Sequence, residues 1–75
     1  MRFFKSKAEK ELDSIIYEMK QFLANNYKDL AHSYRKKLLE RTEELYLSGK
    51  LKEEKYKEYI TVYEEYTVML KNYKH

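Results

Sequence analysis

Side chains that could bind a metal ion are few in this chain. It has no cysteine and two histidines, His32 and His75. A zinc site needs three or four nitrogen, sulfur or carboxylate ligands that converge. On a helix His32 shares its polar side with Asp29 and Lys36, and His75 is the last residue. We therefore expect a solvated histidine and no bound metal.

Groups that could support catalysis are equally sparse. Four glutamates flank Gly49 and could gather a cation loosely: Glu43, Glu44, Glu53 and Glu54. No loop presents oxygen ligands at the regular spacing of a calcium site. The serines lack a partner base, and a single glycine cannot build a phosphate-binding loop. We expect these glutamates to solubilise the protein and to cap helices. We expect no cofactor and no enzymatic activity.

A basic cluster is a more credible binding feature. Four side chains fall within about 100° of one another on a helical projection: Lys28, His32, Arg35 and Lys36. They could follow the phosphates of a nucleic acid. Asp29, Glu40 and Glu43 lie close by and weaken the positive potential. The pattern therefore favours a solvated face of mixed charge over a nucleic-acid site.

Arg41 occupies an unusual position, between Leu38 and Leu45 on an apolar helical stripe. The simplest interpretation is that its aliphatic stem packs at the edge of the core while its guanidinium pairs with a glutamate on another helix. The alternative is an anchor for an acidic partner.

The elements that position these residues must come from a small, helix-rich chain. Its 75 residues weigh 9.3 kDa, with one glycine, no proline, nine tyrosines and a net charge of +3. This length supports one domain, residues 1–75, with residues 1–5 as a basic N-terminal arm. No signal-peptide pattern or membrane-spanning run is present, so we expect a soluble, cytoplasmic protein.

Apolar residues at helical spacing predict three helices, at about residues 7–24, 27–47 and 53–73. The first should begin at Ser6, with Glu9 completing a capping box. Asn25 and Asn26 form a plausible break, where Asn26 could cap the second helix or adopt a left-handed conformation. One continuous helix over residues 7–47 is the competing interpretation.

Gly49 is the strongest stop signal, because glycine readily takes the left-handed conformation that ends a helix. Short connections between helices of similar length predict an all-α fold, a small antiparallel three-helix bundle. The alternative is a long-helix hairpin that dimerises.

The third predicted helix has more apolar surface than a peripheral helix normally buries. One stripe, suited to the core, contains Tyr56, Ile60, Tyr63, Thr67 and Leu70. A second stripe lies about 100° away and contains Val62, Tyr66, Met69 and Tyr73, with Leu39 and Tyr46 as a smaller counterpart on the second helix. Tyrosine and methionine are enriched in protein interfaces, so this second stripe predicts a protein-interaction surface.

Residues 49–66 resemble a known kind of segment. They read Gly49-Lys50-Leu51-Lys52-Glu53-Glu54-Lys55-Tyr56, continue through Tyr59 and Tyr63, and end in Glu64-Glu65-Tyr66. This run is similar to the G-K-[IL]-x-x-E-x-Y and Y-E-x-Y segment of helical hairpins in small uncharacterised proteins of phages that infect Gram-positive bacteria. The resemblance implies a small phage or prophage protein and implies no activity.

Together these observations predict a non-enzymatic protein–protein interaction module that binds itself, as a homodimer, or another protein. The alternative is a small nucleic-acid-binding protein that uses the basic face of the second helix. Neither interpretation involves integral association with a membrane.

Overall fold

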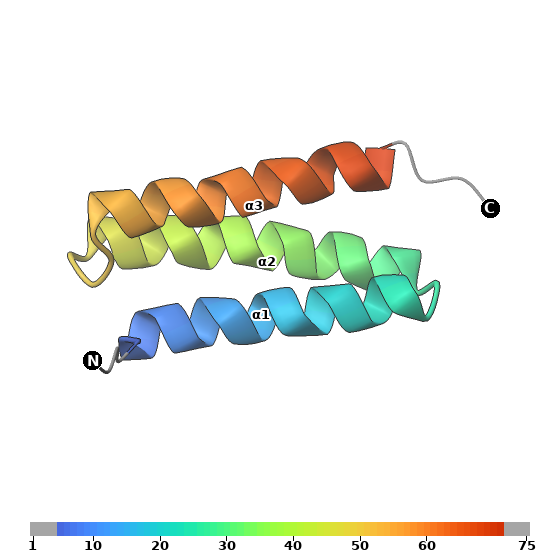
Figure 1. Ribbon diagram of the computed structural model, residues 1–75, viewed down its shortest axis with the longest axis horizontal. Coiled ribbons are helices and arrows are strands. Elements are labelled where there is room, and N and C mark those ends of the chain that lie inside the picture. Colours follow the sequence, from blue (N-terminus) through green and yellow to red (C-terminus); the bar gives the residue numbers. More distant parts are fainter. Residues whose placement is uncertain (1–4, 72–75) are drawn as a thin grey trace, which may run out of the picture.

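The computed structural model describes residues 5–71, which form three helices. Helix α1 spans Lys7–Ala24, α2 spans Lys28–Leu47 and α3 spans Glu53–Lys71. Short connections make neighbouring helices antiparallel (Figure 1). The predicted all-α three-helix bundle is therefore confirmed, and the alternative with one continuous helix over residues 7–47 is wrong.

Helix α1 begins after Ser6, the predicted N-cap, but Glu9 contacts the Ser6 hydroxyl where a capping box has the Ser6 backbone N–H. Ser6 has an extended backbone, and its Oγ accepts a hydrogen bond from the Glu9 backbone N–H at 3.1 Å. The Ser6 hydroxyl also lies 3.3 Å from Glu9 Oε2, to which it donates. The bond from the Glu9 N–H to Ser6 Oγ satisfies one of the backbone donors that have no partner within the helix.

The chain breaks after α1 through a left-handed residue. Asn26 has φ of 61°, and its N–H donates to the Leu23 carbonyl at 3.1 Å, while the Tyr27 N–H donates to the Phe22 carbonyl at 2.7 Å. These two bonds form a Schellman motif. Of the two roles predicted for Asn26, the left-handed conformation is confirmed, whereas the N-cap of α2 is Tyr27, which makes no side-chain capping bond.

Helix α2 ends in the same motif. Gly49 has φ of 81°, its N–H donates to the Tyr46 carbonyl at 3.1 Å, and the Lys50 N–H donates to the Leu45 carbonyl at 2.9 Å. Leu51 follows and is buried. The prediction that Gly49 provides the left-handed stop is confirmed.

Helix α2 lies in the middle of the bundle. It packs against both α1 and α3, whereas α1 and α3 touch each other only weakly. The main buried cluster joins all three helices and contains Ala8, Leu12, Ile15, Met19, Leu38, Leu45, Leu51 and Tyr59. Among residues 5–71, Thr42 is the one polar residue that is buried. Both outer helices pack on α2, and they are separated from each other along one side of it.

Candidate interaction groove

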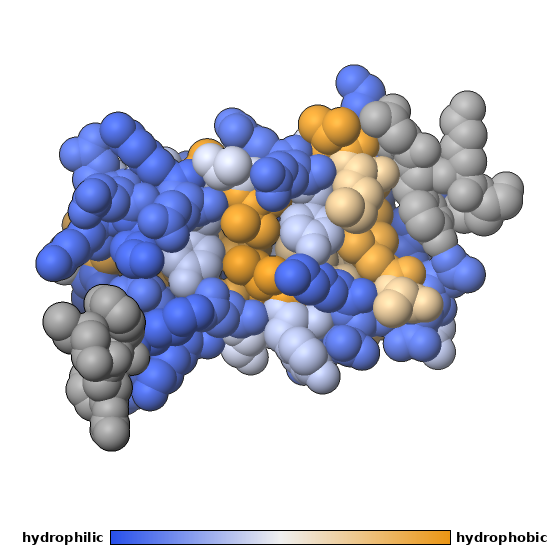
Figure 2. Space-filling view, in the orientation of Figure 1, coloured by the Kyte–Doolittle hydropathy of each residue, from blue (hydrophilic) through white to orange (hydrophobic). Residues whose placement is uncertain are grey.

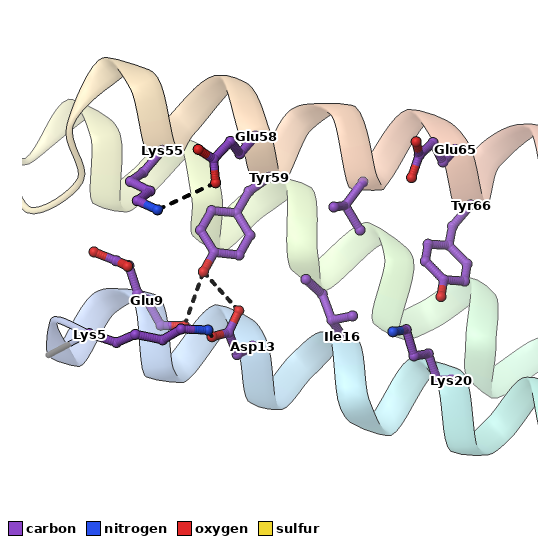
Figure 3. Close-up of a pocket in the computed structure, with 11 residues that line it drawn as sticks. Lys5, Glu9, Asp13, Ile16, Lys20, Lys55, Glu58, Tyr59, Glu65 and Tyr66 are labelled. Carbon is purple, nitrogen blue, oxygen red and sulfur yellow. Dashed lines mark hydrogen bonds and ion pairs between the residues drawn. The ribbon is translucent and has the colours of Figure 1, made fainter. Parts of the chain in front are cut away.

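A groove of about 390 Å³ runs between α1 and α3 (Figure 3). One wall is formed by α1 and the residues before it, the other by α3. The lining residues are Lys5, Glu9, Asp13, Ile16 and Lys20 on one wall, and Lys55, Glu58, Tyr59, Val62, Glu65 and Tyr66 on the other. We call this feature the α1–α3 groove.

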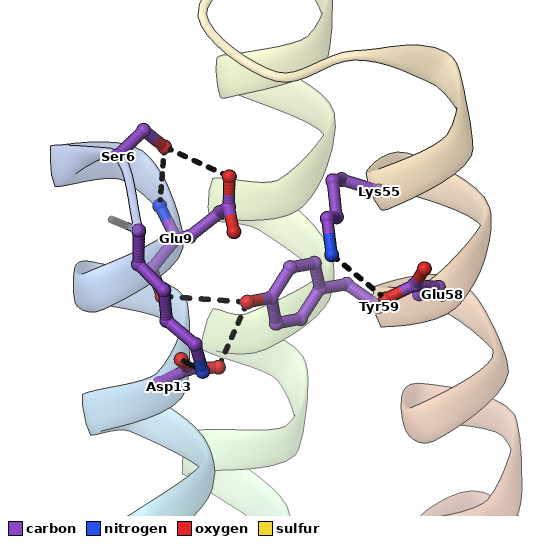
Figure 4. A network of polar contacts seen from close by, with 7 residues as sticks. Ser6, Glu9, Asp13, Lys55, Glu58 and Tyr59 are labelled. Atoms are coloured by element: carbon purple, nitrogen blue, oxygen red, sulfur yellow. Dashed lines mark hydrogen bonds and ion pairs between the residues drawn. The ribbon is translucent and has the colours of Figure 1, made fainter. Parts of the chain in front are cut away.

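Tyr59 fills the end of the α1–α3 groove nearest the start of both helices. The residue is 7% exposed, and its hydroxyl donates to Asp13 Oδ1 at 2.8 Å and lies 3.4 Å from the Glu9 carbonyl oxygen (Figure 4). Burial, followed by the hydrogen bond to Asp13, raises the pKa of Tyr59 well above its usual value. Lys5 forms an ion pair with Asp13, which raises the pKa of Lys5. Polar contacts thus close this end.

The remainder of the groove combines apolar and charged side chains. Ile16 and Val62 are half-buried on opposite walls, and Lys20 and Tyr66 reach into the groove from α1 and α3 (Figure 3). Burial raises the pKa of Tyr66, with a smaller contribution from the charge of Glu65. Figure 2 shows apolar surface between α1 and α3, toward the end where both helices finish.

Both walls repeat side chains at the spacing of a coiled-coil seam. On α3, Tyr59, Val62, Tyr66 and Met69 follow one another at intervals of three, four and three residues. On α1, Asp13, Ile16 and Lys20 of the lining, with Leu23 beyond it, repeat the same intervals, and charged and apolar residues alternate along this line. This alternation keeps one line of side chains facing a neighbouring helix. Each wall of the groove therefore has the residue spacing with which one helix packs against another.

The structure brings together part of the predicted interaction surface. Val62 and Tyr66 line the groove, and Met69 continues their stripe with 49% of its surface exposed. Tyr73 lies outside the described residues. Tyr46 is not in the groove, because its ring stacks on Tyr56 with centroids 4.2 Å apart. Leu39, which is half-buried, shares the side of α2 that carries Tyr46, seven residues away.

Ile16 and Lys20, on the opposite wall, are not among the binding residues predicted from the sequence. The signal that could have found them is the matching alternation of three and four residues on α1 and α3. Up-down-up topology makes α1 and α3 parallel, so two such seams lie at corresponding heights.

The predicted basic face is partly used within the fold. Arg35 is half-buried, its Nη1 donates to Thr67 Oγ1 at 2.8 Å, and its guanidinium lies 5.1 Å from the centre of the Tyr63 ring. Lys36 is exposed, while Lys28 and His32 are partly buried. Arg35 therefore joins α2 to α3, and its guanidinium is engaged by that contact.

The structural interpretation of Arg41 is confirmed. Its Nη2 donates to Glu11 Oε1 at 2.8 Å and its Nε to Glu11 Oε2 at 2.5 Å, which joins α2 to α1. Nη1 donates to Glu44 at 2.6 Å. The hydrogen bonds from Arg41 hold the pKa of Glu11 below its ordinary value.

Within residues 5–71 no three acidic or histidine side chains lie close enough to hold a metal ion. In the same part of the chain, none of the helices combines the length and apolar character needed to cross a bilayer.

No protein-family model, curated protein or solved structure matches the chain. The functional interpretation therefore depends on the geometry of the α1–α3 groove.

Proposed function

We propose that the protein is a non-enzymatic interaction module whose α1–α3 groove receives an α-helix. The observation that carries this proposal is the pair of parallel seams, on α1 and α3, that face a common groove with Ile16, Val62 and Tyr66 in its walls. Binding of an amphipathic helix in an apolar groove is a common mode of protein recognition.

The helix arrangement supports a helical occupant. In a four-helix bundle each helix packs against two neighbours around a common core. Here α2 has two neighbours, whereas α1 and α3 each have one. The three helices thus occupy three corners of a four-helix bundle, and the α1–α3 groove lies at the fourth. A docked helix would give α1 and α3 their second neighbour.

The burial of the groove residues indicates a reversible interaction. Ile16, Val62 and Tyr66 are already half-buried in the single chain. Full burial of a large apolar side chain is worth about 1.5–3 kcal/mol, so each half-buried residue gains roughly half of that on docking. Gains of this size suit a partner that associates and dissociates. Because these residues are already half-buried, the single chain stays folded without the partner.

The resemblance of residues 49–66 to phage helical-hairpin segments supports a place for this module among small phage or prophage proteins. We assign it to the cytoplasm, where its partner would be a second copy of itself or another protein.

The test uses a labelled synthetic helix with leucine and isoleucine at alternating intervals of three and four residues. Titration with dilute protein, followed by fluorescence polarisation, should show saturable binding. Tyr66→Glu should abolish binding, because a carboxylate would enter the apolar part of the groove. Tyr17→Glu is the matched control, since Tyr17 is 60% exposed on α1 and does not line the groove. Absence of binding, or equal binding by both variants, would contradict the proposal.

A further inference from the structure

We infer that the helix filling the α1–α3 groove is α3 of a second copy of this chain, docked reciprocally in a parallel two-fold dimer. The inference rests on the proposed function, because a groove that accepts no helix accepts no second copy.

The chain itself carries a helix suited to the groove. The groove-side stripe of α3 contains Val62, Tyr66 and Met69, at the spacing that the walls require. Met69 is 49% exposed, and Val62 and Tyr66 are half-buried. Each α3 therefore serves as a wall of its own groove and as the helix that enters the other.

Two-fold symmetry makes this arrangement closed. When a rotation axis parallel to the helices lies between the two copies of α3, placing one α3 in a groove automatically places the other in the second groove. The same surface patch is used on both chains, as in most homodimers. Because the axis is parallel to the helices, equivalent residues meet at the same height, with Met69 beside Met69 of the second copy.

Charge complementarity supports the same arrangement. Glu65 lies about 180° around α3 from the core residue Tyr56, taking about 100° per residue. In the proposed dimer that side of α3 faces α1 of the second copy. Lys20 lies on the groove side of α1, at the height of Glu65 and Tyr66 (Figure 3). The dimer therefore brings Lys20 of each chain close to Glu65 of the other, twice by symmetry.

The closed end of the groove limits how tight the dimer is. Tyr59 and the Lys5–Asp13 ion pair fill the groove at the start of α3, so the described contact runs from Val62 to Met69, about two turns. An interface of this size is at the small end of specific protein contacts. We expect a dimer that dissociates on dilution through the micromolar range.

The experiment begins with sedimentation equilibrium of the intact chain over a hundredfold range of concentration. The average mass should rise from 9.3 kDa toward twice that value. Lys20→Glu and Glu65→Lys should each weaken association about tenfold, because each places like charges together twice per dimer. The double variant carrying both changes should recover association. Lys36→Glu, on the exposed part of α2, is the matched control and should leave the dissociation constant unchanged.

A cross-linking variant tests the parallel orientation. The natural chain has no cysteine, so Met69→Cys introduces a unique thiol. Oxidation should convert this variant to a disulfide-linked dimer, whereas Leu47→Cys, at a residue that is 82% exposed on α2, should remain largely unlinked. Circular dichroism should show the same helix content in all variants.

A mass of 9.3 kDa at every concentration would overturn the inference. So would a dimer that the charge reversals do not weaken, or one in which Met69→Cys does not cross-link. In those cases, Tyr66-dependent binding of the synthetic helix would leave the proposed function standing with a different partner. Loss of that binding as well would remove both.

Discussion

The hydroxyl of Tyr59 donates a hydrogen bond to Asp13 Oδ1 at 2.8 Å, joining α3 to α1 across 46 residues of sequence. The other two helix pairs are joined in a similar way, α1 to α2 by Glu11 and Arg41, and α2 to α3 by Arg35 and Thr67. A polar side-chain contact thus fixes each pair of helices. The contact made by Tyr59 matters most for the groove, because α1 and α3 have little else between them.

Tyr59→Phe should therefore reduce the free energy of unfolding by about 1 kcal/mol, the typical net value of a hydrogen bond, while the buried ring is retained. Urea denaturation followed by circular dichroism measures the change. Tyr17→Phe removes the hydroxyl of a 60% exposed side chain and should have no effect. Equal stabilities of the Tyr59 variant and the natural chain would show that the bond contributes nothing.

The Glu11–Arg41 pair should make stability depend on pH in the acid range. Arg41 lowers the pKa of Glu11 in the folded state below the ordinary value of 4.5. The unfolded chain therefore binds a proton first as the pH falls, so the contribution of this pair is present above 4.5 and is lost through the lower folded pKa. The measurement is the difference in urea midpoint between the natural chain and Glu11→Gln. That difference should be largest near neutral pH and should disappear in acid, and a difference that persists unchanged would contradict the assignment.

Gly49→Ala should cost about 1 kcal/mol of stability, because φ of 81° is unfavourable for a residue with a Cβ. A steric clash is not the cause, since a Cβ at this position would meet nothing within 4 Å. Asparagine tolerates the left-handed conformation better than alanine. Thermal unfolding should consequently rank the natural chain above Gly49→Asn, and Gly49→Asn above Gly49→Ala. The reverse order of the two variants would refute the conformational explanation.

Thr42→Val should stabilise the protein by about 1 kcal/mol. Thr42 is completely buried, and its Oγ1 has no hydrogen-bond partner, so the hydroxyl is desolvated without compensation. Valine has nearly the same shape and removes that cost. Thr67→Val should have the opposite sign, because Thr67 Oγ1 accepts from Arg35 at 2.8 Å. Chemical denaturation of the two variants tests this contrast, and destabilisation by Thr42→Val would show that the hydroxyl is satisfied in solution.

Local features of the fold were predictable from sequence because they depend on a few neighbouring residues. The Ser6 cap and the Gly49 stop each follow from the conformational preference of one residue type. The pairing of Arg41 with a glutamate was predictable as well, since a cation on an apolar stripe needs a counter-charge. The N-cap of α2 was harder, because Asn26 suits both a capping role and a left-handed one.

The groove was only half predictable. Helical periodicity placed Val62 and Tyr66 on a stripe separate from the core of α3, but it could not show which helix that stripe faces. That depends on the rotation of α3 about its own axis and on the separation of α1 from α3, which the packing of all three helices determines. Periodicity also could not show that Tyr46 lies away from this stripe. Its ring stacks on Tyr56, where α2 packs against α3.

The odd number of antiparallel helices has a mechanical consequence. It places Lys7, at the start of α1, and Lys71, at the end of α3, at opposite ends of the bundle (Figure 1). Tension applied between these two residues pulls α1 and α3 in opposite directions along α2, so both helix interfaces are loaded in shear. In a two-helix hairpin, with both attachment points at one end, the contacts would instead be peeled apart one after another. The central position of α2 therefore lets the contacts of a whole interface share the load.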